Sequence, residues 1–442
     1  MTYASAALGG GLIVPRLEHL YLASDLGDIA PASALAYLSA IASGMMAFTA
    51  IVFSIAYITV QFNAVAYSPR LALWFADDPR TFHALGLFIA TFLAAISTIA
   101  WVERGEEGGV PLISSLLVLV LLITSTLQFA RLVRGLSEMQ ISNTLHLIGD
   151  RGRAVIDEMY PCADGFEAGS RAALSRLAEA VRLGPPKQTV RYAGVPRTIG
   201  GFEIYDLVAQ AERAGATIEI LCAVGDTLID DTALFDVFGA AIPVAEQKLL
   251  TTIRLGPQRT FEQDPKYPMR LLVDIAIKAL SPAINDPTTA VQAIDEIEDI
   301  LRRLARRELS VGFVTDARGA LRLLFPMPSW EDYLHLAFDE IRHYGSDSVQ
   351  VMRRLRAALD GVAESVVDEE RASAVERYIK HLQMAIDRSA LDSDDRLLAS
   401  QADRQGLGLS RNRQQQPGVV EPQPGQNGKR SGIHALDGIS RC

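Results

Sequence analysis

The chain has 442 residues, of which 49% are hydrophobic and 21% charged, and its formal net charge at pH 7 is -10. The charges are unevenly spread, because the first 130 residues hold only four basic and eight acidic side chains. This split excludes a simple soluble enzyme, a disordered chain and a transporter that is hydrophobic throughout.

The N-terminal segment near residues 3–14 is apolar but shorter than the roughly 20 residues that a helix needs to cross a membrane. Pro15 and Arg16 follow it directly. We favour a shortened first span, with an interfacial segment, a re-entrant segment or a signal sequence as alternatives. The signal sequence is disfavoured because no basic region follows Met1.

Three longer stretches are predicted to cross the membrane, near residues 34–60, 83–102 and 110–130. The first lies within 41 consecutive residues without a charge, well above the roughly 20 that one span requires. Residues 1–130 are therefore expected to form an integral membrane domain of three to four transmembrane helices.

Small side chains lie along one face of the first long span, at spacings of four, four, three and four residues. They are Ser39, Ser43, Ala47, Ala50 and Ser54. Small residues let helices approach closely in lipid, where packing drives association. The face is interpreted either as helix packing inside one subunit or as the lining of an oligomeric pore. No ionisable residue lies deep in a span, which disfavours ion-coupled transport and leaves a passive pore open.

The distribution of lysine and arginine predicts the orientation. Arg70 and Arg80 flank the loop after the first long span, and two further arginines follow the last span, whereas the loops near 16–28 and 103–107 carry more acids than bases. Basic loops face the cytoplasm. We therefore expect a multi-pass protein of the bacterial inner membrane whose large C-terminal region is cytoplasmic.

The remaining chain is expected to be a cytosolic α+β region that is mostly helical. Periodicity and composition predict a helical stalk over 131–188, a small α+β module over 189–240 and a helical domain over 241–400. The module has a strand, helix, strand pattern whose helix ends at Gly215. Residues 402–442 are rich in Gln, Gly and Pro and are expected to be disordered.

The most distinctive polar stretch runs from residue 259 to 297, with two predicted helices joined by a short turn. Asp286 is expected to cap the second helix, with Pro287 at its first position. The stretch is either a structurally required turn or a binding site for an ion, a phosphorylated ligand or a neighbouring subunit. The residues expected to converge there are Arg259, Glu262, Asp264, Asp274, Asn285 and Asp286.

Residues 57–92 and 259–295 resemble the bacterial predicted-membrane-protein family called domain of unknown function 2254. The specific parts are Ser68-Pro69-Arg70 and the run ALSPAINDPTTA. The resemblance covers about residues 10–390 and implies an N-terminal membrane region and a cytosolic remainder, without an established activity. The chain departs from the family pattern in its short first span and in the lack of histidines over residues 129–136.

The sequence contains none of the common catalytic or nucleotide-binding motifs. It has no Gly-x-Ser-x-Gly nucleophile elbow, phosphate-binding loop, dinucleotide-binding fingerprint or His-Glu-x-x-His metal-binding helix. The seven histidines are scattered, which argues against a metal site, and no cofactor is indicated. Cys162, Cys222 and Cys442 lie far apart and are expected to be unpaired. The acidic balance argues against nucleic acid, which leaves the lipid bilayer and further copies of the chain as expected partners.

Two hypotheses on function follow. In the first, the protein is an oligomeric channel or permeability factor built around the small-residue helix. In the second, it is a membrane-anchored ligand-sensing or scaffold protein whose cytosolic region binds through the polar stretch. An enzyme is a third and weaker possibility, because no catalytic motif is present.

Overall fold

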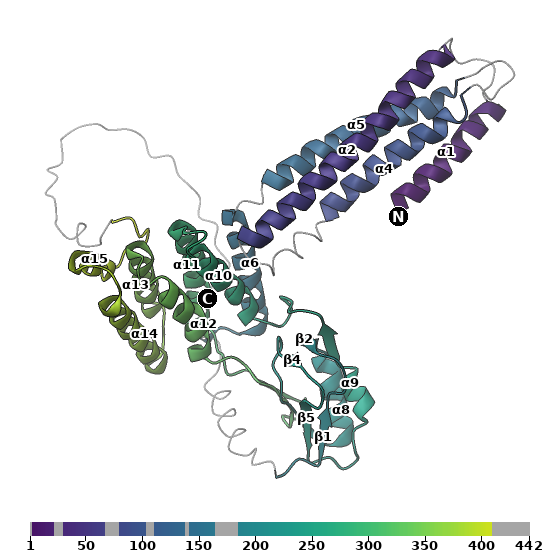
Figure 1. The fold of residues 1–442 in the computed structure, drawn as a ribbon. Coiled ribbons are helices and arrows are strands. Elements are labelled where there is room, and N and C mark those ends of the chain that lie inside the picture. The colour runs from purple at the N-terminus through teal and green to yellow at the C-terminus, as the bar shows by residue number, and fades with distance from the viewer. Residues whose placement is uncertain are drawn as a thin grey trace, which may run out of the picture. The chain divides into compact units, whose positions relative to one another are not determined.

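The structure is a computed structural model that describes residues 2–21, 30–66, 79–102, 110–137, 141–163 and 184–408. The chain divides into two compact units, Met1–Asn143 and Thr144–Cys442 (Figure 1). Three expected features lie outside the described residues: the Ser-Pro-Arg motif after the first long span, the second half of the stalk over 164–183 and the tail beyond residue 408.

The described part of the first unit contains the helices α1 (Thr2–Tyr21), α2 (Pro31–Ala66), α4 (Pro79–Ile99) and α5 (Leu112–Ser137). Three segments are long and apolar enough to cross a membrane, namely Pro31–Ile58, Thr81–Ile99 and Leu112–Arg134. They coincide with the three charge-poor stretches, so the predicted membrane domain of three to four helices is confirmed.

Helix α1 is longer than the sequence suggested, because it continues through Pro15 to Tyr21. Proline removes one backbone hydrogen bond, a loss that neighbouring helices can offset in a membrane bundle. A helix of 20 residues is about 30 Å long, which matches the hydrocarbon core of a bilayer.

Helices α1 and α4 lie side by side and run in the same direction (Figure 1). Near their N-termini, the Tyr3 hydroxyl lies 3.1 Å from Nδ1 of His83. Nearer their C-termini, a Cβ added to Gly11 would lie 2.5 Å from Cβ of Ser97. The glycine therefore permits a backbone approach that a larger residue would prevent, as is common between membrane helices.

The buried carboxylate of Glu18 joins the end of α1 to the start of α5. Its Oε1 accepts a hydrogen bond from the Ile113 amide at 2.7 Å, and its Oε2 accepts from the amide and hydroxyl of Ser114 at 3.1 and 3.0 Å. The first amides of a helix have no partner within the helix and favour a negative charge. Glu18 thus caps α5 from a different helix.

One face of α2 packs into the core of this unit. Its buried residues are Ala34, Leu38, Ile41, Ala42, Met45 and Val52. Phe48 contacts the rings of Phe88 and Phe129, with centroids 5.3 and 4.6 Å away. The core of the membrane unit therefore joins α2 to both α4 and α5.

The second unit contains two β-sheets. The five-stranded sheet has the order β1 (Gln188–Arg191), β5 (Ala233–Phe238), β3 (Thr217–Ile220), β8 (Leu321–Leu324) and β7 (Phe313–Thr315). Among the strands of this sheet in the described residues, only β3 and β8 pair in parallel. The three-stranded antiparallel sheet has the order β4 (Thr227–Leu228), β2 (Arg197–Phe202) and β6 (Ile253–Gly256).

The α+β module extends beyond the expected limit of residue 240, since β6, β7 and β8 come from later in the chain. Strands β3 and β5 pair antiparallel on either side of the loop that contains Gly225, and β4 within that loop joins β2 in the other sheet. Helix α8 (Ile204–Ala214) ends as predicted at Gly215, whose φ of 61° is left-handed. The short helix α9 (Glu246–Leu250) precedes β6.

Seven further helices complete the described part of the second unit. They are α6 (Ile141–Met159), α10 (Lys266–Ala279), α11 (Pro287–Leu304), α12 (Trp330–Tyr344), α13 (Val349–Ala363), α14 (Glu369–Arg388) and α15 (Ser393–Ala399). Helix α6, expected to belong to a stalk, packs on α11, where a Cβ on Gly152 would lie 2.9 Å from Cδ1 of Ile300. His146 and Arg153 of α6 both bind Glu296 of α11.

The basic residues Arg353 and Arg354 of α13 are buried, although arginine side chains usually lie on a solvated face. Arg354 donates to Asp295 at 2.7 Å and to Glu298 at 2.6 Å, both on α11. Arg353 pairs with Asp403 at 3.4 Å. Their acidic partners lie 50 or more residues away in the sequence, so spacing along α13 could not reveal them.

We predict that Gly11→Leu destabilises the membrane unit by about 1–3 kcal/mol, because the larger side chain forces α1 away from Ser97. Gly9→Leu is the matched control, since a Cβ there meets no atom within 4 Å. Urea unfolding of the full-length protein in detergent, followed by circular dichroism, measures both. Equal stability of the two variants would contradict the packing of α1 on α4.

Candidate functional site

The six predicted site residues are distributed among three sets of interactions. The first is a buried ion pair, in which Nε and Nη2 of Arg259 each donate to a carboxylate oxygen of Asp264 at 2.8 Å. The side chain of Asp264 is only 3% exposed, and it also accepts from the Tyr267 amide at the start of α10. Two parallel hydrogen bonds to one carboxylate give both strength and a fixed geometry.

The charge of Asp264 acts on a neighbouring pair of tyrosines. The hydroxyls of Tyr160 and Tyr333 lie 2.8 Å apart, and both side chains are fully buried. Burial raises the pKa of Tyr160 to about 12, and the Asp264 carboxylate adds to this increase. Burial is also the main cause of the raised pKa of Asp264, which the Arg259 guanidinium opposes. Both tyrosines therefore stay neutral and serve as hydrogen-bonding groups between α6 and α12.

The turn at Gly225 closes over this ion pair. Gly225 has a φ of 92°, and a Cβ there would lie 2.6 Å from Nε of Arg259 and 2.7 Å from Oδ2 of Asp264. Only glycine combines this backbone conformation with so close an approach. The ion pair thus holds the loop between β3 and β4 against the start of α10.

The second set is near the surface and includes Glu262. Its carboxylate accepts from Arg254 at 2.5 Å, and Arg254 also lies 3.3 Å from Glu203. All three side chains are substantially exposed. Exposed pairs of this kind contribute little to stability.

The third set connects α10 to its neighbours. Asp274 accepts from Nε of Arg270 at 2.8 Å, and Arg270 also donates to Glu340 of α12. Asp286 caps α11 as predicted, accepting from the amide and hydroxyl of Thr289 at 3.1 and 2.6 Å. Asn285 has a left-handed φ of 50°, which suits the tight turn between α10 and α11.

All three sets hold secondary-structure elements together, which favours the interpretation as structurally required contacts. Ligand binding by these six residues stays a prediction. The described residues contain no group of three or more His, Cys, Asp or Glu side chains placed to hold a metal ion. Cys222 is a buried free thiol, as expected, and burial raises the pKa of this thiol.

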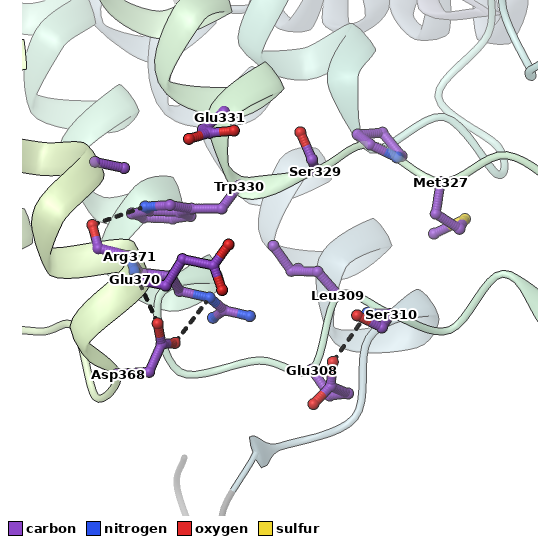
Figure 2. Close-up of a pocket in the computed structure, with 12 residues that line it drawn as sticks. Glu308, Leu309, Ser310, Met327, Ser329, Trp330, Glu331, Asp368, Glu370 and Arg371 are labelled. Atoms are coloured by element: carbon purple, nitrogen blue, oxygen red, sulfur yellow. Dashed lines mark hydrogen bonds and ion pairs between the residues drawn. The ribbon is translucent and has the colours of Figure 1, made fainter. Parts of the chain in front are cut away.

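The structure shows a cavity of about 540 Å³ that sequence reasoning missed (Figure 2). Its lining comes from residues 308–310 after α11, from residues 327–331 at the start of α12, and from four residues at the start of α14, namely Asp368, Glu370, Arg371 and Ala374. The Trp330 ring is a main part of the wall, and its indole donates to the Arg371 carbonyl at 3.3 Å. Because three distant segments form the cavity, no local sequence motif could indicate it.

The small-residue face of α2 is exposed at all five positions, from Ser39 to Ser54. The buried residues of α2 lie on the opposite side of the helix, at its contact with α4 and α5. The hydroxyl of Ser43 donates to the Ser39 carbonyl at 2.8 Å, and that of Ser54 to the Ala50 carbonyl at 2.9 Å. This face is therefore not used for packing within the described part of the chain.

Three apolar N-terminal helices followed by a mostly helical region with two sheets define a membrane protein with a soluble α+β part. The chain belongs to the predicted membrane protein family DUF2254, whose profile matches residues 1–361. The resemblance to this family that the sequence indicated is thereby confirmed.

Similar proteins occur in mycobacteria. Uncharacterized proteins of Mycobacterium bovis and Mycobacterium tuberculosis are each 28% identical to the chain over 409 residues, which cover 90% of this chain and 76% of theirs. No solved structure matches the chain.

We predict that Asp264→Ala destabilises the protein by about 2–3 kcal/mol, because it leaves Arg259 without its buried partner. The loss is smaller than for a fully buried pair, since 31% of the Arg259 side chain is exposed. Asp286→Ala, which removes only a helix cap, should cost about 1 kcal/mol. Urea unfolding measures the loss of stability in both variants. A larger loss for Asp286→Ala than for Asp264→Ala would refute the central role of the ion pair.

Proposed function

We propose that the protein is a multi-pass protein of the inner membrane that forms a homo-oligomer through α2 and acts as a channel or permeability factor. The observation that carries the proposal is the exposed face of small residues on α2. Within one chain this face has no helix packed on it in the described residues, while the opposite face of α2 is buried.

The spacing of this face suits contact between two membrane helices. Residues four and three positions apart share one side of a helix, so Ser39, Ala47 and Ser54 lie along one line. Small side chains allow backbones to approach and to gain van der Waals contact, which drives helix association in lipid. In an oligomer, copies of α2 would meet or surround a central path along this line.

The chemistry of the spans supports passive rather than coupled transport. The apolar segments of α2 and α4 contain no Asp, Glu, Lys or Arg. The hydroxyls of Ser43 and Ser54 donate to backbone carbonyls of α2, which leaves their oxygens able to accept hydrogen bonds. A path lined in this way would be weakly polar and would offer no site for proton relay.

The arrangement of α1 supports a cytoplasmic position for both ends of the membrane unit. Helix α1 runs parallel to α4, and Glu18 joins its C-terminal end to the start of α5. Four helices that alternate in direction return the chain to the side on which it began. Arg131 and Arg134 at the end of α5 favour the cytoplasm for that side.

A second candidate function is ligand sensing by the soluble unit, which the cavity at the start of α12 and α14 favours. Its volume of about 540 Å³ lies within the range of small-molecule sites, and its wall combines apolar and charged groups. In this case the membrane helices would serve as an anchor.

We predict that the double variant Ser43→Leu, Ala47→Leu weakens the oligomer, because two bulky side chains separate the facing helices. Cross-linking in native membranes should show loss of the oligomer, and ion flux into vesicles with reconstituted protein should change. Gly44→Leu is the matched control, since this position is exposed on α2 but lies off the small-residue face. A monomeric parent protein without flux would exclude the channel.

The orientation is tested with reporters fused after residue 408. A cytoplasmic C-terminal region predicts a fluorescent green fluorescent protein fusion and an inactive alkaline phosphatase fusion, because the phosphatase requires export to form its disulfides. The opposite pattern would place the soluble unit outside the cytoplasm.

A further inference from the structure

We infer that the soluble unit contacts the membrane surface through the turn between α10 and α11, whose apolar tip enters the lipid headgroup region. The turn consists of residues 281–285, and Tyr344 at the end of α12 lies beside it. The partner of this surface is the bilayer itself. The inference does not depend on a channel or on ligand sensing, because it requires only that the N-terminal helices lie in a membrane.

The covalent chain keeps the start of α6 near the membrane. The apolar segment of α5 ends at Arg134, and the helix itself ends at Ser137. Only residues 138–140 separate it from Ile141, where α6 begins. A fully extended chain covers at most about 14 Å between Ser137 and Ile141. This limit holds for every arrangement of the two units, because it depends on chain length alone.

The turn belongs to the same end of the soluble unit as the start of α6, because α6 and α11 run in parallel. A Cβ on Gly149 of α6 would meet the Glu296 carboxylate of α11. Further along both helices, Asp157 accepts from Arg303 at 2.8 Å. Both helices begin about two turns before the Gly149 contact, so their starts lie side by side. The turn that leads into α11 is therefore held near the membrane together with the start of α6.

Hydrogen bonds give the turn a fixed shape that leaves its apolar side chains exposed. The Ser281 hydroxyl donates to the Lys278 carbonyl at 2.7 Å. The Ser281 carbonyl accepts from the amides of Ile284 and Asn285 at 3.0 and 2.8 Å. Residues 282–284, with the sequence Pro-Ala-Ile, form the tip and are all exposed. Because these two amides are already paired within the turn, the cost of taking the tip out of water is lower.

The residues around the tip suit the boundary between lipid and water. Ile284 is 38% exposed although it is apolar, and Tyr344 is 58% exposed. Tyr344 lies beside the turn, since a Cβ on the following Gly345 would lie 3.4 Å from Cδ1 of Leu280. Tyrosine is enriched at membrane interfaces because it joins an apolar ring to a polar hydroxyl. Lys278 in the last turn of α10 supplies a positive charge for lipid phosphates.

The small size of this surface favours lipid over a protein partner. A stable protein interface buries about 800 Å² on each side. The apolar part here is a single turn and one aromatic ring. A weak contact suffices for a unit that the chain already holds near the membrane, because the tether raises its local concentration there. The charge of Asp286, which follows the turn, is met by the start of α11 that it caps.

Cross-linking of the full-length protein in lipid vesicles tests this contact. The photo-reactive amino acid p-benzoylphenylalanine replaces Ile284 or Tyr344, and mass spectrometry of the intact protein identifies what it captures after illumination. We expect lipid adducts at both positions. Val367 is the matched control position, since it is 68% exposed. It lies just before α14, whose Arg371 carbonyl accepts from Trp330 at the opposite end of α12 from Tyr344.

All three replaced side chains are exposed, so the substitutions leave the core intact. Capture of protein instead of lipid at positions 284 and 344 would overturn the inference and identify a protein partner for this surface. Equal amounts of lipid adduct at all three positions would show random collision with the bilayer and would also overturn it. Absence of adducts at 284 and 344 would do the same.

Discussion

The buried ion pair between Arg259 and Asp264 is the interaction on which the soluble unit depends. It lies where the loop between β3 and β4 meets the start of α10, and its charge acts on the tyrosine pair between α6 and α12. Without its partner, either group would leave a partly buried charge uncompensated, at a cost of about 2–3 kcal/mol. The pair therefore fixes the β-strands and the helices in one arrangement.

In the membrane unit, a buried carboxylate likewise joins two helices. Glu18 gives α5 its N-terminal cap, and the glycine at position 11 allows α1 to lie against α4. A carboxylate is tolerated there because every hydrogen bond it accepts comes from a helix start. The two contacts make α1 part of the bundle and leave the small-residue face of α2 as surface for other copies or for lipid.

The two functional proposals concern different surfaces of the same chain. The α2 face consists of small residues with satisfied hydroxyls, which suits contact between identical helices or a weakly polar path. The cavity beside Trp330 lies in the second unit, and its wall combines apolar and charged groups.

The sequence by itself determined the membrane helices, the family and many of the local elements. These depend on neighbouring residues: on runs of apolar side chains, on the Asp286 cap of α11 and on Gly215, which ends α8. It placed six polar residues in one stretch, but could not show that Asp264 meets Gly225 or that β8 joins β3. Nor could it show the acidic partners of Arg354 or the cavity at Trp330. Only the tertiary structure decided these, since each depends on segments that are distant in sequence and meet only when the chain folds.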